Sequence, residues 1–579
     1  MKQTLALLCT FLISLSILGQ DNPYLNLDFE EYTPMGHPKS WMMRTGIGKM
    51  MVSHEEPQSG DVCLETSLEK DDYIMVSNSL PDEALVNKTF RITGKIKTMN
   101  ITKYATFFLR ADNHEGESIV FENMAGKWAK GDTDWQTYSL ELKVPENTAR
   151  MVFGILVVGQ GKAFYDDLSI SIDNEPFTQV RPKPLIPTAG DLAWIKKNAS
   201  PFEDLSEARA FKDMVGTHRL VLLGAGSNGT VEFDDIRLGI TRYLLEEKDF
   251  SVVAVEADAL PVAKVNHYVK TGEGDLKSLL SQLDSIALNT REFMSTVMMM
   301  RSLHQSGKSS PSLVGIHVKS PELAIESVKT FVARVDPQFF DKLNRYYYHN
   351  VSEIWKTFNG PSGRMLADND TWRNEATLVL KHLQDNAGSY AQNAKKSEIE
   401  QAIFEARLVV QNMDYHSKGM LDAALVENIQ WILEKRGVNT GVVVWSHNDR
   451  VRKDGKAMGA LLAQKYGDAV LNMGFLFHEG TYTAQGEKGI ASYETYPSEP
   501  GCAEWFLKES GLNSFLLDLR KASGNSDASW LTKSLEIRSI HDEADAYAFK
   551  KDRLGEMFDT VTFFQKSNPT HPLPVTKTE

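Results

Sequence analysis

The most informative segment of the chain is residues 220–229, which read Leu-Val-Leu-Leu-Gly-Ala-Gly-Ser-Asn-Gly. An apolar run of this length predicts a buried strand, and the glycines that follow it predict a tight turn. Residues 233–244 then carry apolar side chains at helical spacing. A strand, a glycine turn and a helix in this order are typical of α/β proteins, which place their chemistry at such turns.

Further apolar runs of strand length follow at residues 251–255, 313–316, 442–445 and 470–475. Because they alternate with helical segments, residues 191–566 are predicted to form an α/β domain with a mostly parallel sheet flanked by helices. Residues 325–435 are helical in pattern, and we expect them to form a helical lobe over the carboxyl ends of the strands. The tail, residues 567–579, contains Pro569, Pro572 and Pro574 and is predicted to be loose.

Residues 21–178 have a different pattern, with short strand-like runs separated by Gly, Asn and Asp. This pattern predicts a β-sandwich. The order of its landmarks, from Asn26–Glu30 to Ala163–Leu168, resembles the galactose-binding-like jelly roll of many carbohydrate-binding modules. That resemblance implies sugar binding by aromatic stacking, for which the candidates are Trp41, Trp128 and Trp135. The alternative is that these tryptophans only pack the domain. Residues 179–190 are rich in proline and predict a stiff linker.

The N-terminus, residues 1–20, has a basic residue followed by a short apolar core, which is typical of a signal peptide. We therefore expect an exported protein, periplasmic or extracellular, with no membrane span in the mature chain. The net charge of −14 argues against a nucleic-acid partner. Cys63 and Cys502 are far apart in the sequence and are predicted to be free thiols.

Read letter by letter, the turn at residues 224–229 is G-x-G-x-x-G, the fingerprint of a dinucleotide site. Such a site also needs an acidic residue at the end of the second strand, roughly 20 residues on. Glu256 ends that strand but lies 27 residues past Gly229, and the domain offers no second fingerprint. A nucleotide cofactor is therefore the weaker interpretation.

Other blocks of the second domain resemble the erythromycin esterase family. The family's turn reads G-E-G-[ST]-H-G-x-x-E-F, and its second strand ends A-x-E-A-D, which matches residues 254–258 here. Residues 315–321 resemble the family's G-x-D strand end and the step after it, and residues 421–431 resemble the helix R-D-x-x-M-A-x-N-x-x-W. Residues 445–450 resemble W-A-H-N-x-H. These blocks occur in the family's order over about residues 190–500.

The resemblance implies metal-independent hydrolysis of a carboxylic ester or lactone, with no cofactor and with a small-molecule ester or lactone as the ligand of the cleft. It further implies that a turn histidine acts as the base on a water molecule, while carboxylates orient and stabilise the imidazole. On this basis Glu256, His317 and His447 are the catalytic candidates.

Several positions depart from the family pattern. The turn glutamate is Ala225 and the base histidine is Asn228, while the third-strand aspartate is His317. The helix arginine is Leu421, and the last histidine of W-A-H-N-x-H is Arg450. Because asparagine cannot take a proton from water near neutral pH, loss of the base predicts a fall in rate of roughly 10²–10⁴-fold.

The departures leave three hypotheses open. The first is a catalytically impaired relative, or pseudoenzyme, whose cleft only binds a ligand, with Asn228, Asp422 and Arg450 as binding residues. The second is an active hydrolase with a relocated base, either His317 or His447, together with Glu256. The third is a cell-surface protein that binds a glycan through its N-terminal domain.

Overall fold

The computed structural model describes residues 23–574, except residues 45–47, 81–82, 115, 182, 203–208, 284, 318, 320, 359–368, 419, 487–488 and 546. The chain divides into two compact units, Met1–Lys183 and Pro184–Glu579. This division falls inside the predicted linker, residues 179–190. The predicted signal peptide, residues 1–20, lies outside the described residues.

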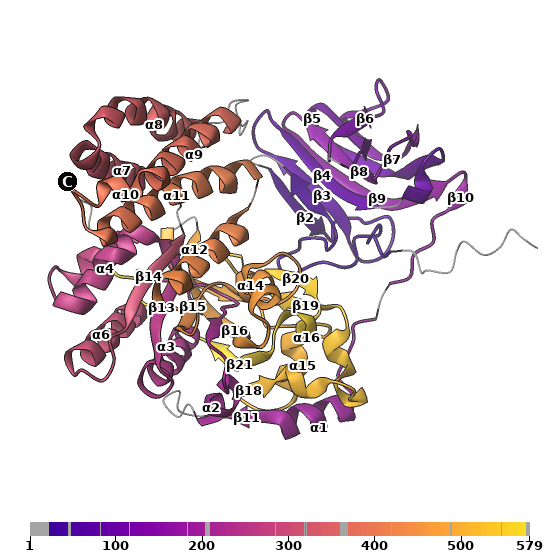
Figure 1. Cartoon of the computed structure of the whole chain (residues 1–579). Coiled ribbons are helices and arrows are strands. Elements are labelled where there is room, and N and C mark those ends of the chain that lie inside the picture. The colour runs from indigo at the N-terminus through magenta and orange to yellow at the C-terminus, as the bar shows by residue number, and fades with distance from the viewer. Residues whose placement is uncertain are drawn as a thin grey trace, which may run out of the picture. The chain divides into compact units, whose positions relative to one another are not determined.

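The first unit is one large antiparallel sheet with the strand order β1-β4-β8-β5-β9-β3-β2 (Figure 1). The 24-residue β5 pairs with β6, β7, β8 and β9 along its length, so a single strand organises most of the sheet. The jelly-roll topology stays a prediction. The strands are β1 Met42–Arg44, β2 Lys49–Ser53, β3 Cys63–Leu68, β4 Tyr73–Leu80, β5 Thr89–Asp112, β6 Ser118–Glu122, β7 Ala129–Lys143, β8 Arg150–Val158, β9 Gly161–Ile172 and β10 Glu175–Pro176.

The second unit contains a mixed sheet with the order β11-β18-β21-β16-β12-β15-β13-β14, and β17 pairs with β16. Neighbouring strands from β21 to β14 are parallel, whereas β11, β17 and β18 pair in antiparallel fashion. The strands are β11 Ala199–Pro201, β12 Leu220–Leu223, β13 Phe250–Asp258, β14 Ser312–His317, β15 Gly441–Trp445, β16 Val470–Gly486, β17 Gly489–Thr495, β18 Ser514–Asp518 and β21 Thr560–Ser567; β19 Leu535–Arg538 and β20 Phe549–Asp552 form a separate hairpin.

Both faces of this sheet are buried, as an uninterrupted apolar strand predicts. In β12, Val221 and Leu223 join a core with α3 Val231–Glu247, α4 Ala259–Thr271 and α6 Arg291–Gln305, whereas Leu220 and Leu222 face the opposite side. The opposite core is covered by α1 Ala189–Asn198, α12 Leu421–Arg436, α14 Met458–Tyr466, α15 Ala503–Glu509 and α16 Leu554–Met557. The remaining short helices are α2 Arg209–Val215, α5 Leu276–Ser281 and α13 Asn448–Val451.

A helical lobe is inserted between β14 and β15 (Figure 1). It has its own apolar core, built by α7 Glu322–Val335, α8 Pro337–Phe358, α9 Asn369–Asp385, α10 Ala387–Tyr390 and α11 Lys396–Lys418. Helix α11 reaches the carboxyl end of β14, because Asn412 Nδ2 donates to Lys319 O at 2.9 Å and Tyr415 packs edge-on against His317. The lobe therefore contributes to the edge of the sheet at which the strands end.

Cys63 and Cys502 are free and buried, which confirms the prediction for these two thiols. In the part of the chain that the structure describes, no helix has both the length and the apolarity needed to cross a bilayer.

The C-terminal tail is docked as far as residue 574, which corrects the expectation of a loose segment. Thr570 N donates to Gly229 O at 3.1 Å, and Leu573 N donates to Asn289 O at 2.9 Å. Leu573 joins the apolar core around α3 and is 5 % exposed. Proline has no N–H to donate, but the backbone N–H groups of Thr570 and Leu573 make the hydrogen bonds that hold the tail.

Replacing Leu573 by alanine therefore tests whether the tail belongs to the fold. We expect Leu573→Ala to lower the free energy of unfolding by about 2–4 kcal/mol, because it empties a buried site. Urea unfolding measures the change, and Leu378→Ala, at a leucine 49 % exposed on α9, serves as the control. Equal stability of the two variants would contradict the docked tail.

Candidate functional site

The candidate site lies where adjacent parallel strands end together. Leu223 pairs with Trp445, Val255 pairs with Trp445, and Asp258 pairs with His317. Residues that follow these pairs in the sequence therefore meet at one edge of the sheet, which is where ligands bind in open α/β sheets.

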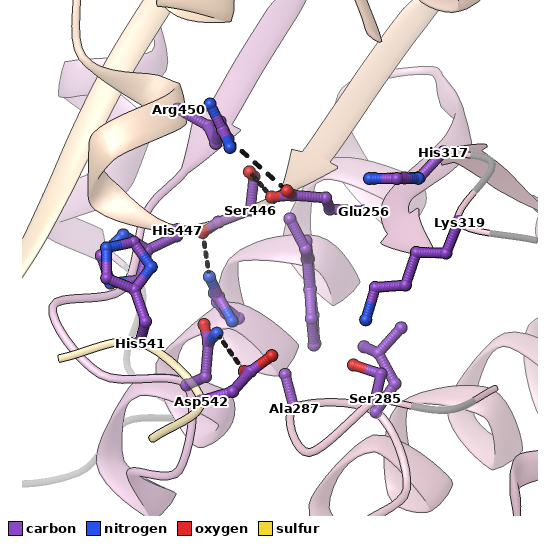
Figure 2. A pocket seen from close by; sticks show the side chains of 14 residues that line it. Glu256, Ser285, Ala287, His317, Lys319, Ser446, His447, Arg450, His541 and Asp542 are labelled. Atoms are coloured by element: carbon purple, nitrogen blue, oxygen red, sulfur yellow. Dashed lines mark hydrogen bonds and ion pairs between the residues drawn. The ribbon is translucent and has the colours of Figure 1, made fainter. Parts of the chain in front are cut away.

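A cavity of about 130 Å³ opens at this edge (Figure 2). Its wall combines residues from strand ends, from the glycine turn and from two loops. The lining residues are Asn228, Arg237, Glu256, Ser285, Ala287, Leu288, His317, Lys319, Trp445, Ser446, His447, Arg450, His541 and Asp542. The structure thus brings Asn228, Glu256, His317, His447 and Arg450 together, as the sequence predicted, while Asp422 lies behind Arg450.

The glycines of the turn are explained by close backbone packing. A Cβ on Gly224 would lie 2.8 Å from Met473 O and closer still to Asn448 Oδ1, and one on Gly226 would lie 2.8 Å from Phe475 O. A Cβ on Gly229 would collide with Thr483 O. These glycines let the turn lie against β16, so the G-x-G-x-x-G spelling needs no nucleotide to account for it.

Asn228, which the sequence resemblance aligns with the family's base histidine, has a side chain that is held in place. Its Nδ2 donates to Asp542 Oδ1 at 2.8 Å on the cavity wall. Ala225, at the position of the family's glutamate, is 1 % exposed and packs in the core. Neither side chain can accept a proton from a water molecule, so the first turn supplies no general base.

The carboxylate of Glu256 is engaged by two neighbouring side chains. Ser446 Oγ donates a short hydrogen bond to Glu256 Oε2, and Arg450 Nε lies 3.6 Å from Glu256 Oε1. Arg450 also donates to Asp422 Oδ2 at 2.5 Å, and Asp422 accepts the Met458 N–H at 2.8 Å. The two carboxylates and the guanidinium form one hydrogen-bonded network in which a single positive charge is shared between two negative ones.

His317 is 5 % exposed at the end of β14. Its Nδ1 lies 3.9 Å from Asp258 Oδ1, and its ring packs edge-on against Tyr415 at a centroid distance of 5.8 Å. The ring lines the cavity, but the carboxylate next to Nδ1 is that of Asp258 rather than that of Glu256. Its catalytic role stays a prediction.

His447 uses both ring nitrogens to hold the backbone. Nε2 contacts Ile540 O at 3.1 Å, and Nδ1 accepts the Asp449 N–H at 3.2 Å as the N-cap of α13. Burial, followed by the neighbouring His541, lowers the pKa of His447 to about 3. A neutral imidazole with its lone pair engaged cannot take a proton from water, so the geometry speaks against His447 as the relocated base.

His541 is the site residue that the sequence analysis missed. Its ring stacks on His447 at 4.1 Å, and its Nε2 contacts Asp449 Oδ2 at 3.0 Å. The His541 side chain is 53 % exposed, and among the described residues its Nδ1 has no hydrogen-bond partner. When Asp449 accepts from Nε2–H, the Nδ1 lone pair is left available, which is the arrangement of a histidine base.

Asp449 is well suited to hold that histidine. Its Oδ2 also accepts from Ser539 Oγ at 3.0 Å and from Lys550 Nζ at 2.9 Å. Burial raises the pKa of the Asp449 carboxyl, but the hydrogen bonds from His541 and Lys550 and the nearby His447 outweigh burial and hold the pKa below its usual range. Asp449 is therefore ionised and fixes the tautomer of His541.

His447, Asp449 and His541 are also the group among the described residues whose ligand atoms all lie within 4.8 Å of one another. These residues do not fit a metal ion. Both ring nitrogens of His447 are engaged by the backbone, and the Lys550 ammonium occupies the same carboxylate oxygen as His541. A cation would have to displace these donors.

Arg237 lines the cavity and donates hydrogen bonds to carbonyls at the ends of two neighbouring strands. Its Nη2 donates to Leu223 O at 3.2 Å and to Ser446 O at 2.5 Å, and its Nη1 lies 3.5 Å from Asp234 Oδ1. The guanidinium also lies 5.4 Å from the centre of the Trp445 ring. Burial lowers the pKa of Arg237 and raises that of Asp234, and each partner opposes the shift of the other.

The tryptophans of the first unit have different surroundings. Trp41 is 5 % exposed, donates to Asn26 O and packs on Phe29, so it offers no ring face to a sugar. This corrects the expectation for Trp41. Trp128 stacks on Tyr104 at 4.5 Å, and Trp135 is half-buried with its Nε1 donating to Glu56 O; for these two rings, sugar binding stays a prediction.

The fold and the site define an α/β protein with a polar cavity at its strand ends, the usual location of an enzyme site in this architecture. The erythromycin esterase family model matches residues 245–567, more than half of the chain, so the protein belongs to the erythromycin esterase family. The match begins after the turn that carries Ala225 and Asn228.

Known proteins are consistent with this assignment. The putative hydrolase YbfO of Bacillus subtilis is 20 % identical over 378 residues, which cover 58 % of this chain and 83 % of YbfO. The uncharacterised HTH-type transcriptional regulator YbfP of the same organism is 28 % identical over 132 residues, or 22 % of this chain and only 43 % of YbfP. The erythromycin esterase EreC in its open conformation shares the fold, with a TM-score of 0.52 and 15 % identity over 64 % of this chain and 97 % of EreC.

The pKa of His447 makes stability depend on pH. Between about pH 3 and pH 6.5 the unfolded chain binds a proton at this histidine and the folded chain does not, so stability falls as the pH is lowered. We expect His447→Asn, which keeps an N-cap acceptor, to remove up to about 1.4 kcal/mol per pH unit from this slope. Urea unfolding between pH 4 and pH 7 measures it, with His267→Asn at an exposed histidine as the control. Parallel curves for wild type and His447→Asn would contradict the assignment.

The role of Arg237 is tested by Arg237→Met. This change leaves Asp234 buried without its partner and releases Leu223 O and Ser446 O, so we expect a loss of about 3–5 kcal/mol in the free energy of unfolding. Arg242→Met, at an exposed arginine on the same helix, is the matched control and should change stability by less than about 0.5 kcal/mol. A loss of unfolding free energy no greater than that of Arg242→Met would show that the contacts of Arg237 do not stabilise the fold.

Proposed function

We propose that this protein is a hydrolase of small carboxylic esters or lactones that works at the strand-end cavity with His541, held by Asp449, as its general base. The observation that carries the proposal is His541 on the cavity wall, hydrogen-bonded through Nε2 to Asp449 and with Nδ1 available to a water molecule. Membership of the erythromycin esterase family supports the reaction class.

The chemistry requires no more than these side chains and water. His541 Nδ1 takes a proton from the water whose oxygen attacks the carbonyl carbon, and Asp449 stabilises the imidazolium that forms. The tetrahedral intermediate then expels the alkoxide, which takes the proton back from His541.

The proposed enzyme differs from the family design in where its base stands. Asn228 and Ala225 remove the base and its carboxylate from the first turn, whereas His541 comes from the loop between β19 and β20. Asn228 instead donates to Asp542, the residue that follows His541, and so helps to hold that loop against the cavity. A base contributed by a loop is held less precisely than one next to a strand end, so we expect a lower rate of turnover.

The test is an assay of the purified protein with p-nitrophenyl acetate, γ-butyrolactone and δ-valerolactone. We expect turnover above the buffer rate, and we expect His541→Gln to lower kcat by roughly 10²–10⁴-fold, since it removes the base. Asp449→Asn should lower kcat as well, because the amide no longer fixes the tautomer.

His267→Gln is the matched control. His267 is an exposed histidine on α4, outside the cavity lining, and its Nε2 lies 3.0 Å from the carboxylate of Glu273. It should leave the rate unchanged. Activity that survives His541→Gln would refute the assigned base.

The second candidate is a pseudoenzyme whose cavity binds a ligand without turning it over. The specific observation in its favour is the Asn228–Asp542 hydrogen bond, in which the amide that the resemblance aligns with the family base is a donor and cannot accept a proton from water. Binding of a substrate analogue in the cavity, together with buffer-level rates for every ester and lactone, would favour this candidate over the hydrolase.

A further inference from the structure

We propose that residues 568–573, which we call the clasp, position two walls of the cavity through two separate contacts. One contact acts on the glycine turn and, through the turn, on His541. The other acts on the loop that carries Leu288. The inference deepens the proposed function and relies on it for the kinetic effects, whereas the separate control of the two walls is a property of the fold that can be measured without turnover.

The clasp consists of two tripeptides that bind in the same way. Residues 568–570 lie at the start of α3 and form a bridge with its N-cap Thr230, and residues 571–573 lie at the start of α6 and form a bridge with its N-cap Thr290. Each tripeptide has a proline in the middle, and that proline is the residue in the bridge. The repeat therefore places one tripeptide on each of two helix starts.

Each tripeptide also binds a glutamate in the first turn of its helix. Asn568 donates from its backbone N and from Nδ2 to the two carboxylate oxygens of Glu232, at 2.9 and 2.7 Å. His571 lies in the same way against Glu292, with its backbone N donating to Oε2 at 3.1 Å and its Nδ1 2.7 Å from Oε1. The helix dipole favours a carboxylate at this position, and its hydrogen bonds are charge-assisted. Asparagine and histidine thus have equivalent roles in the two halves of the clasp.

The backbone of the first tripeptide holds the glycine turn. Val231 N–H donates to Asn568 O at 3.0 Å, and Thr570 N–H donates to Gly229 O at 3.1 Å. Gly229 directly follows Asn228, which lines the cavity. The first tripeptide therefore fixes the turn immediately next to a residue of the cavity wall.

The glycine turn holds the segment around His541. Ile540 N–H donates to Gly226 O at 2.8 Å, and Asp542 Oδ1 accepts from Asn228 Nδ2 at 2.8 Å. His541 lies between Ile540 and Asp542 in the chain, so these two bonds fix its position on either side. A displacement of the turn therefore moves the proposed base, and the contact at residue 568 positions that base through the turn.

The second tripeptide holds a different part of the wall. Leu573 N–H donates to Asn289 O at 2.9 Å, and Asn289 Nδ2 donates to Leu573 O at 3.3 Å. Asn289 directly follows Leu288, and the backbone N–H groups of both residues bond to Ser285 O, at 2.9 and 3.2 Å respectively. Because Leu288 and Ser285 line the cavity, the contact at His571 positions this loop rather than the proposed base.

Two single variants of the full chain separate the two contacts in an assay with p-nitrophenyl acetate. Asn568→Ala removes a donor to Glu232, and we expect kcat to fall roughly threefold to tenfold with KM within about twofold, because the base is misplaced. His571→Ala removes a donor to Glu292, and we expect KM to rise roughly threefold to tenfold with kcat within about twofold, because a binding wall is displaced. Both residues are exposed, so both variants should fold.

Hydrogen exchange resolved to single amides tests the same division without turnover. We expect Asn568→Ala to speed exchange of the Ile540 amide and His571→Ala to speed exchange of the Leu288 amide, each by roughly threefold to tenfold, with the other amide unchanged. The Ile540 amide is bonded to Gly226 O and the Leu288 amide to Ser285 O, so the effect reaches each of them through the cavity wall.

The repeat supplies the matched controls. Asn568→His and His571→Asn place at each position the residue that occupies the other half, so both should behave like the wild-type chain. His267→Ala removes an exposed histidine that contacts Glu273 outside the cavity lining, and it should change neither amide.

Three outcomes would overturn the inference: equal effects of the two alanine variants on both amides, no change in either amide, or exchanged residues that behave like alanine. Separate effects on the two amides in a chain that hydrolyses no ester would uphold the inference and refute only the proposed function.

Discussion

The site depends on one buried guanidinium. Arg237 donates from α3 to the carbonyls of Leu223 and Ser446, which end neighbouring parallel strands, and lies against the Trp445 ring. Leu223 O also accepts the Ser446 N–H at 3.2 Å, whereas the buried carbonyl of Ser446 lies beyond the end of β15 and needs a donor. Arg237 supplies that donor and holds the glycine turn next to the segment 446–450; these two segments contribute Asn228, Ser446, His447 and Arg450 to the cavity wall.

Near Arg237, several polar side chains of the cavity wall are engaged by neighbouring groups. The carboxylate of Glu256 forms an ion pair with Arg450 and accepts a hydrogen bond from Ser446. The amide of Asn228 donates a hydrogen bond to Asp542. His447 has become a helix cap and a support for the His541 ring. Of the three histidines on the cavity wall, His541 is the exposed one, and its pairing with Asp449 is the reason that we propose it as the base.

Much of this could be predicted because it follows local patterns. The apolar runs at residues 220–223 and 442–445 lie within strands, and the residues after them meet at one edge because neighbouring parallel strands end together. The docked tail, the burial of Trp41 and the engagement of both His447 nitrogens could not be predicted. Each depends on a partner that is remote in sequence: Gly229 for the tail, Asn26 and Phe153 for Trp41, and Ile540 for His447.

The sequence by itself determined the second unit's strands and the resemblance to the family, because periodicity, short motifs and residue identity are local properties. Only the tertiary structure decided which histidine remains able to accept a proton. Imidazole basicity depends on burial and on which nitrogen a neighbour occupies, and the neighbours of His541 come from a segment about ninety residues earlier in the chain.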